Sequence, residues 1–345
     1  MNTECPLPVF TDETVRVGHG SGGELSQRLI SELIRPHFDN PWLRQAHDSA
    51  TLCPGSERIV FTTDSFVVSP LFFPGGDIGE LAVYGTVNDL AMSGAVPRFL
   101  SCSLILEEGL PMQTLDRALA SMGRAARDTG VQLVTGDTKV VERGKGDGLY
   151  INTAGIGVLE HSEVIAPERI APGDLILLSG DIGRHGMAVM ATREGLEFES
   201  PLRSDCAPLA EPVLALLNAG ITVHCLRDLT RGGLATALVE LAESAGRELV
   251  VEEAAIPVSE PVQGACELLG LDPLYVANEG RFIAFVPADR AVEALAILQG
   301  TAVAADSRVI GSASTGHRPR VIMRNTIGSE RLLDRLPGEQ LPRIC

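Results

Sequence analysis

The amino-acid sequence predicts a protein of the α/β (α+β) class with two domains. Segments with the three- and four-residue spacing of a helix face alternate along the chain with short apolar runs typical of strands. The chain has 345 residues, which is long for a single domain. Hydrophobic residues make up 45% of it and aromatic residues only 4%, so aliphatic side chains must build its cores.

The first half of the chain begins with strand signals and continues with two helices. In the second helix, Thr114 is the expected N-cap and Gly130 the C-terminal stop. The elements expected here, in order, are strands at 58–61 and 67–68, helices at 79–93 and 115–129, and strands at 131–134 and 149–159.

Prolines interrupt the pattern in the middle of the chain, at Pro167 and Pro172. We therefore predict an N-terminal domain over residues 1–166 and a C-terminal α/β domain over 167–327. The elements expected in the second domain are strands at 175–178, 221–225, 249–251, 282–286 and 308–311, and helices at 187–194, 209–219 and from about 234 to 245. Residues 328–345 lack sustained periodicity, which predicts a mobile, extended tail.

Charge and cysteine usage exclude several classes of protein. A net charge of −17 argues against nucleic acid as a partner, because phosphate binding needs clustered Lys and Arg. The seven cysteines form no C-x-x-C pair, so neither a zinc site nor a disulfide framework is indicated. We see no signal peptide and no apolar run long enough to span a membrane, and we expect a cytoplasmic protein.

Four aspartates stand beside Gly, Thr or Asn where we expect the ends of strands or helices: Asp48, Asp64, Asp89 and Asp137. Carboxylates that converge on one point repel each other unless a cation lies between them. Mg²⁺ that carries nucleotide phosphates suits such a cluster, because it prefers oxygen ligands. The alternative is that each Asp caps a helix or closes a turn.

A glycine-rich segment, Gly18–Gly23, precedes a helical stretch near Glu24. Its exposed backbone N–H groups, including those of Gly20 and Gly22, could hold an anion at a helix N-terminus. The segment matches neither of the standard nucleotide motifs, so a flexible linker is the other interpretation.

Two further residues are candidates for proton transfer. Lys139 follows Asp137 by two positions, so both side chains would point to one side of an extended segment. Such a lysine could neutralise phosphate charge or move protons, or form an ordinary ion pair. Glu279 lies in an Asn-Glu-Gly turn and could act as a base or be simply exposed.

Cys345 is the last residue and follows two prolines, Pro337 and Pro342, that stiffen the tail. We expect its α-carboxylate to raise the pKa of the thiol and Arg343 to oppose that effect. The segment could reach away from the body or fold into a pocket. The other interpretation is an incidental thiol at a disordered end.

Taken together, these motifs resemble the HypE family of hydrogenase maturation factors, in order from about Val17 to Cys345. The glycine, aspartate and threonine turns are shared with a wider superfamily that includes aminoimidazole ribonucleotide synthetase, whereas the ending Pro-Arg-Ile-Cys is specific to HypE. The residues that carry the resemblance are Gly18–Gly23, Thr63-Asp64-Ser65, 70–76, Asn88-Asp89-Leu90, Gly136-Asp137-Thr138-Lys139, 227–233 and 342–345.

The resemblance implies a two-domain aminoimidazole ribonucleotide synthetase-like fold, a homodimer formed by the N-terminal domains, and ATP with Mg²⁺ as cofactors. It implies that the HypF carbamoyltransferase loads a carbamoyl group onto Cys345, that ATP-dependent dehydration turns it into a thiocyanate, and that the cyanide passes to a HypC–HypD complex for the [NiFe] hydrogenase iron centre. The implied roles are catalysis by Cys345, Lys139 and Glu279, ATP binding by Gly20, Gly22, Asp64, Asp89, Gly136 and Asp137, and metal binding by Asp48, Asp64, Asp89 and Asp228.

Two positions depart from the family pattern. Arg184 stands where we expect an acidic residue before His185, and Arg281 stands where we expect Lys after Asn-Glu-Gly. Two other functions stay open: a related ATP-dependent synthetase for selenophosphate or a purine intermediate, and a non-catalytic scaffold for hydrogenase assembly.

Overall fold

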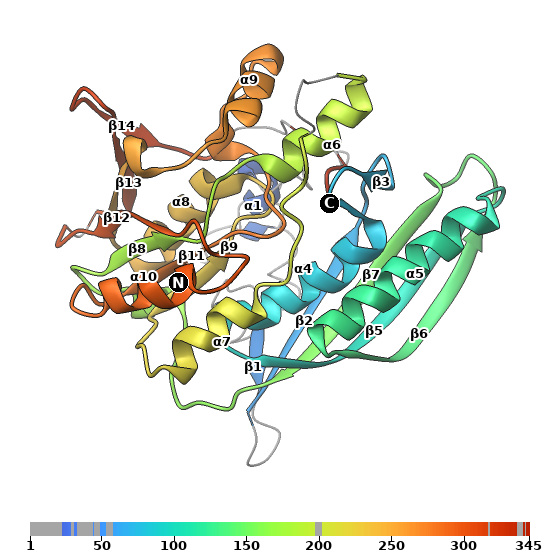
Figure 1. Cartoon of the computed structure of the whole chain (residues 1–345), viewed down its shortest axis with the longest axis horizontal. Helices are drawn as coiled ribbons and strands as arrows, with labels where there is room; N and C mark the ends of the chain where they lie inside the picture. Colours follow the sequence, from blue (N-terminus) through green and yellow to red (C-terminus); the bar gives the residue numbers. More distant parts are fainter. Residues whose placement is uncertain are drawn as a thin grey trace, which may run out of the picture.

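The computed structural model describes residues 23–28, 31–32, 44, 49–52, 58–196, 202–316, 318–336, 341 and 343–345. Two β-sheets, each packed against helices, form the body of the protein (Figure 1). The first sheet has the strand order β1-β2-β7-β5-β6, and the second has the order β14-β13-β10-β12-β8-β11-β9. A small hairpin, β3-β4, accompanies the first sheet.

The strands of the first sheet and the hairpin are β1 (Ala50–Leu52), β2 (Ile59–Phe66), β3 (Phe72–Phe73), β4 (Gly76–Asp77), β5 (Val96–Glu107), β6 (Gln132–Val141) and β7 (Leu149–Val158). Those of the second sheet are β8 (Leu175–Leu178), β9 (Cys225–Asp228), β10 (Glu248–Glu252), β11 (Phe282–Val286), β12 (Arg308–Ala313), β13 (Arg320–Arg324) and β14 (Glu330–Leu333). The α-helices are α1 (Glu24–Arg28), α4 (Ile78–Met92), α5 (Met112–Thr129), α6 (Arg184–Glu194), α7 (Ala210–Asn218), α8 (Gly233–Ala245), α9 (Glu260–Leu269) and α10 (Ala291–Gln299). Short 3₁₀ turns are η3 (Pro167–Arg169), η4 (Glu253–Ala255) and η5 (Pro273–Tyr275).

Helices α4 and α5 cover one face of the first sheet, and no described helix covers the other face, which we call the open face. Along β2, Val60 and Phe66 point to the helices and are buried, whereas Phe61 points away and is 42% exposed. Phe99 and Ile156, paired across β5 and β7, are exposed on the same open face. A sheet with a partly apolar, uncovered face suits contact with another surface.

Helix α4 joins the two halves of the molecule. Asp77 caps it by accepting hydrogen bonds from the N–H groups of Gly79 and Glu80. The helix packs on α5, β2 and β7 and also contacts α7 and β9 of the second half. Its Asn88 donates to the carbonyl of Ala207 and accepts from the N–H of Leu209, so both halves are fixed to this helix.

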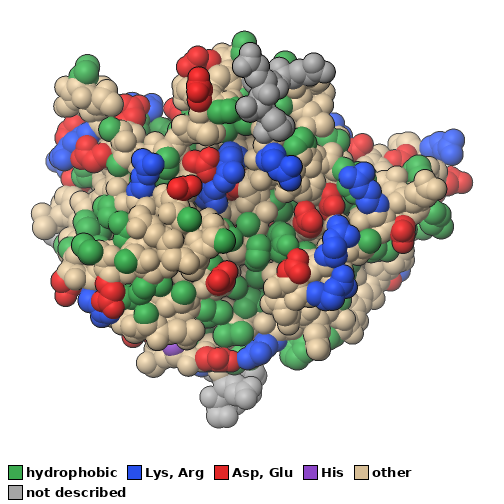
Figure 2. All heavy atoms as spheres, viewed as in Figure 1, with side chains coloured by type: hydrophobic (Ala, Val, Ile, Leu, Met, Phe, Trp, Pro, Cys, Tyr) green, Lys and Arg blue, Asp and Glu red, His purple; other side chains and the backbone are tan. Residues whose placement is uncertain are grey.

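The second sheet is covered on both faces. Helix α8 packs on one face in one apolar cluster, and α7 with α10 packs on the other face in a second cluster. Strand β11 is accordingly buried at all five positions. Figure 2 shows Asp and Glu side chains dispersed among Lys and Arg over one face of the molecule. No described helix is both long and apolar enough to cross a membrane.

The expected fold class is confirmed, and so are most of the expected elements. The expected gap between strands at 58–61 and 67–68 is wrong, because β2 is continuous through Phe66. The expected strand at 131–134 extends to Val141, and the strand expected at 221–225 begins only at Cys225. The predicted tail begins later than residue 328, because β14 pairs with β13 in the second sheet.

Candidate active site

The last residues of the chain return to the body and pair with the segment that follows β2. The N–H of Val67 donates to the terminal carboxylate of Cys345 at 3.0 Å, and the N–H of Ser69 donates to the carbonyl of Arg343 at 3.1 Å. Ile344 between them is buried, and Cys345 is half-buried. Figure 1 shows this end of the chain beside α6 and β3. The thiol is therefore inside the protein in this structure.

Cys345 is surrounded by ionisable groups from both halves. The pKa of its thiol is raised well above the ordinary value, first by burial and then by Glu279, while Arg231 opposes the shift. Asp64 and a hydrogen bond to Glu279 raise it further. The sequence-based expectation named Arg343 as the opposing charge and was wrong, because Arg343 forms an ion pair with Asp147 instead.

Glu279 is the most perturbed acid near the thiol. It is 4% exposed, and its Oε1 atom has no hydrogen-bond partner among the residues that the structure describes. Burial raises its pKa well above the ordinary value of 4.5, and the charges of Asp228, Asp64 and Asp205 add to that effect. A carboxyl group with a raised pKa beside a reacting group is suited to proton transfer.

The neighbouring residue fixes the position of Glu279. The side chain of Asn278 accepts from the N–H of Gly183 at 2.7 Å and donates to the carbonyls of Leu229 and Val276. The turn is thus tied to the start of α6 and to the end of β9. From the sequence, Glu279 could act as a base or be simply exposed. The structure excludes simple exposure, because the side chain is buried.

Asp64 and Asp89 approach the same region from β2 and α4. Asp89 accepts from the hydroxyl of Thr62 at 2.8 Å, and Asp64 accepts from the N–H of Ser65 at 2.7 Å. Burial raises the pKa of Asp64 in spite of the nearby charge of Arg231. Both aspartates raise the pKa of Arg231, after the larger effect of Cys345. The two carboxylates, Arg231 and the thiol therefore share one electrostatic environment.

These carboxylates supply only part of the ligand set that a magnesium ion needs. Among the residues that the structure describes, no group of three or more His, Cys, Asp or Glu side chains is arranged to hold a metal. Mg²⁺ that arrives with a nucleotide needs only one or two protein carboxylates, because phosphates and water supply the other oxygens. The site thus suits a metal delivered with its nucleotide. Asp228 lies beside Glu279, on which its charge acts.

Lys139 and Asp137 lie apart from this group. Both are in the middle of β6, where they form an exposed ion pair with 2.9 Å between Nζ and Oδ2. Their partners in β5, Ile105 and Ser103, alternate with residues that face the helices, so the pair lies on the open face of the sheet. We expected Asp137 at the end of a strand, which was wrong, because β6 continues to Val141. Gly136 is needed for packing, since a Cβ there would lie 2.3 Å from the carbonyl oxygen of Cys102.

Three residues of the predicted site, Gly20, Gly22 and Asp48, lie outside the described residues. The first described residue of the glycine-rich segment is Gly23, which is buried and leads into α1. The N–H of Glu24 donates to the carbonyl of Leu336, so this segment lies near the start of the tail.

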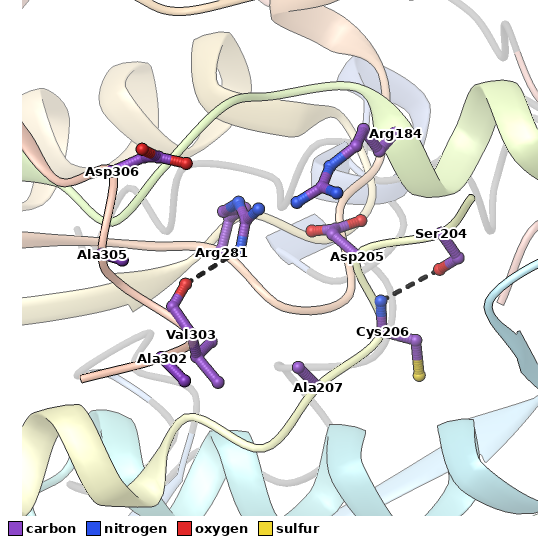
Figure 3. A pocket seen from close by; sticks show the side chains of 10 residues that line it. All are labelled: Arg184, Ser204, Asp205, Cys206, Ala207, Arg281, Ala302, Val303, Ala305 and Asp306. Carbon is purple, nitrogen blue, oxygen red and sulfur yellow. Dashed lines mark hydrogen bonds between the residues drawn. The ribbon is translucent and has the colours of Figure 1, made fainter. Parts of the chain in front are cut away.

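The two departures from the family pattern meet at one place. Arg184 and Arg281 both form ion pairs with Asp181, at 3.1 and 2.8 Å, and both line a polar pocket of about 250 Å³ (Figure 3). The guanidinium of Arg281 also donates to the carbonyls of Gly280 and Val303. Arg281 therefore holds the Glu279 turn by structural hydrogen bonds.

Sequence reasoning missed Arg231, His185 and Arg193 as site residues. Arg231 stands in a motif that the sequence did single out, the loop between β9 and α8, but its charge is close to Cys345 only in the folded chain. His185 and Arg193 both bind the tail from α6. No local pattern reveals that role, because the tail is some 150 residues away along the chain.

Comparison with known proteins defines the class first. The family described as AIR synthase related protein matches over both of its domains, the N-terminal domain at residues 46–159 and the C-terminal domain at 171–324. The chain belongs to this class of proteins.

Within the class, the chain is a member of the carbamoyl dehydratase HypE family. It is 52% identical to carbamoyl dehydratase HypE of Cupriavidus necator over 96% of this chain and 95% of the relative, and 44% identical to that of Escherichia coli over 96% and 99%. A crystal structure of HypE in complex with ATP is 49% identical with a TM-score of 0.81, covering 96% of this chain and all of that one. A HypE–HypF complex gives 45% identity and a TM-score of 0.85, covering 89% and 99%.

Proposed function

We propose that this protein dehydrates a carbamoyl group on its own Cys345 in an ATP-dependent reaction. S-carbamoyl-Cys345 and ATP give S-cyano-Cys345, ADP and phosphate, so the elements of water leave as part of the phosphate. The observation that carries the proposal is the position of the Cys345 thiol beside the buried Glu279. Membership of the carbamoyl dehydratase HypE family supports it.

The chemistry needs an activated oxygen and a base. Loss of oxygen from an amide is unfavourable in water, so phosphorylation by ATP first makes the carbamoyl oxygen a leaving group. The C–O bond then breaks as the nitrogen protons are removed and the C≡N bond forms. Glu279 is the proposed base for these protons, because a raised pKa makes its carboxylate a stronger base.

Enclosure of the tail matches the chemistry of the intermediate. A phosphorylated carbamoyl group hydrolyses if water reaches it, so the reaction needs an enclosed site. Ile344, next to the reacting residue, is only 3% exposed. The charges of Cys345 and Asp64 both raise the pKa of Arg231. The guanidinium is therefore suited to stabilise the phosphoryl group as it leaves.

ATP is the proposed nucleotide, and Mg²⁺ is proposed to arrive with it. A related HypE has been crystallised with ATP. Asp64 and Asp89 are the described carboxylates that would hold the ion, and Asp48, Asp228, Gly20, Gly22, Gly136 and Asp137 remain proposed contributors to the nucleotide site. The ion would supply charge neutralisation at the phosphates.

The proposed partners follow from the reaction sequence. A related HypE forms a complex with HypF, and we propose that HypF loads the carbamoyl group on Cys345. Loading needs the thiolate, which burial and Glu279 disfavour in the docked tail. The tail must therefore leave the site to be loaded, and again to deliver cyanide to a HypC–HypD complex. We propose that these exchanges take place in the cytoplasm.

We also propose a homodimer formed through the open face of the first sheet. Exposed apolar side chains on that face, such as Phe61, Phe99 and Ile156, favour its burial. Lys139 and Asp137 lie on the same face, so in a dimer they would act at a site shared by the two chains.

The domain boundary is proposed between β7 and β8, near residue 166.

The mass of the C-terminal peptide tests the proposed function. The protein is incubated with HypF, carbamoyl phosphate and ATP, isolated, and then given Mg²⁺-ATP alone. We expect the peptide to gain a carbamoyl group on Cys345 and then to lose one water. A Cys345 that gains the carbamoyl group and never loses water excludes the dehydratase and favours a scaffold.

A further inference from the structure

We propose that Arg193 and His185, both on α6, are positioning residues that hold Cys345 in the site by binding main-chain carbonyls of the tail. The site would then recognise the backbone of residues 343–345 and not their side chains, apart from the buried Ile344. Only the effect of this binding on dehydration rests on the proposed function. The binding itself is tested separately.

Arg193 binds two segments at once. Its Nε and Nη2 atoms donate to the carbonyl of Ser69 at 2.9 and 2.6 Å, and Nη2 also donates to the carbonyl of Arg343 at 2.7 Å. The Arg343 carbonyl accepts a second hydrogen bond from the N–H of Ser69. One guanidinium therefore joins α6, the segment after β2 and the tail, which needs a planar group with several donors.

His185 binds the next carbonyl along the tail. Its Nε2 lies 2.8 Å from the carbonyl oxygen of Ile344, and its Nδ1 lies 2.9 Å from the hydroxyl of Ser204. That hydroxyl already accepts from the N–H of Cys206, so its proton is available for Nδ1. A neutral ring with the proton on Nε2 satisfies both contacts, and burial lowers the pKa of His185 in agreement.

The ring of His185 cannot turn freely. It is fully buried and meets the ring of Phe73 edge to face, with 5.3 Å between centroids. Its donor is thus held towards the carbonyl of Ile344. Together with the pairing to Val67 and Ser69, the carbonyls of Arg343 and Ile344 and the terminal carboxylate of Cys345 each have a donor.

The tail side chains contribute less specific contacts. Arg343 pairs with Asp147 where both side chains are nearly half exposed, and such pairs add little to binding. Arg343 also has a left-handed φ of 52°, which a residue with a Cβ adopts at a cost. The docked tail is therefore held by main-chain hydrogen bonds against local strain, which suits a segment that must leave and return.

The test compares arginines on the same helix in the full-length protein. The variants are Arg193→Ala and Arg193→Lys, the second of which keeps the charge but lacks the planar guanidinium with its several donors. Arg184→Ala is the matched control, since Arg184 pairs with Asp181. Two readouts are used: the rate of alkylation at Cys345 relative to Cys102, and the single-turnover rate of dehydration of loaded protein. The KM for ATP and the melting temperature are measured alongside.

We expect Arg193→Ala to raise alkylation at Cys345 and to slow dehydration by a similar factor, roughly five- to a hundredfold for the lost hydrogen bonds. Arg193→Lys should fall between wild type and Ala, Arg184→Ala should match wild type, and the KM for ATP should not change. Wild-type rates in both readouts for Arg193→Ala and Arg193→Lys overturn the proposal. A wild-type protein that protects Cys345 but never loses water supports the positioning role and overturns the dehydratase.

Discussion

At the scale of single residues, the site depends on carboxyl groups that the fold keeps away from water. Glu279, Asp64 and Asp228 act on each other with Arg231 as the opposing charge, and the thiol of Cys345 lies among them. Groups of like charge raise each other's pKa when they are buried. Burial and the neighbouring carboxylates therefore raise the pKa values of both the docked thiol and Glu279.

Replacement of Glu279 tests its role as the base. We expect Glu279→Gln to bind ATP and accept the carbamoyl group, but to form thiocyanate at least a hundredfold more slowly, as for loss of a general base. In the wild type, the rate should rise with pH as Glu279 ionises, through a pKa above 4.5. Single-turnover rates from pH 5 to 9 measure this. A Gln variant with the wild-type pH profile removes Glu279 from the mechanism.

The same variant has a predicted effect on stability. Because the folded pKa of Glu279 lies above the unfolded value of 4.5, the folded state binds more protons, and wild-type stability falls as pH rises between these values. Glu279→Gln avoids this loss, which is at most about 1.4 kcal/mol for each pH unit in that window. Denaturant unfolding should give equal stabilities near pH 4 and a more stable variant near pH 7. Equal stabilities at both pH values would show that the pKa is not raised.

At the scale of elements, strand β6 depends on one glycine. Gly136→Ala places a Cβ against the carbonyl of Cys102, so we expect a loss of about 1–3 kcal/mol and displacement of Asp137 and Lys139. The matched change is Gly264→Ala in α9, where a Cβ meets nothing within 4 Å. It should stabilise the protein by roughly 0.5–1 kcal/mol. Urea unfolding of both variants measures the two effects, and the same sign for both contradicts the packing account.

The sequence was sufficient to predict elements with strong local patterns. It was insufficient where contacts between distant parts of the chain determine the structure. Helices α4 and α5 were predicted, and Gly130 ends α5 as expected. Thr114 was wrong as the N-cap, because α5 begins at Met112 after Pro111. The elements that were not predicted include helices α9 and α10 and strands β5, β13 and β14. Helix α9 is short with a proline at its start, and β14 lies in a stretch that was predicted to be tail. Cys345 and Glu279 could be named from sequence through the family resemblance. Their contact, and the role of α6 in holding the tail, depend on tertiary packing that no spacing encodes.

At the scale of the whole molecule, the proposed catalytic groups lie in two places. Glu279 and Cys345 are between the two halves of the chain, whereas Lys139 is on the open face of the first sheet. If two chains pair through that face, Lys139 of one chain acts at a site shared with its partner. Catalysis would then require the dimer, and dilution below the dimer dissociation constant should abolish it.

Mixed dimers test this arrangement. Lys139→Ala and Glu279→Gln should each be inactive alone, but mixing with subunit exchange should restore up to half of the wild-type rate in the heterodimer, because one of its two sites has both residues. If Lys139 serves its own chain, every site in the mixture lacks one residue and no activity returns. Thiocyanate formation measured after exchange separates these outcomes.

The central claim is that ATP removes the carbamoyl oxygen from Cys345 as phosphate. The most direct measurement follows that oxygen: Cys345 is loaded with a carbamoyl group labelled with oxygen-18, and Mg²⁺-ATP is added for one turnover. We predict that the inorganic phosphate carries one labelled oxygen for each thiocyanate formed. Unlabelled phosphate, with the label released to water or retained on the protein, contradicts the account.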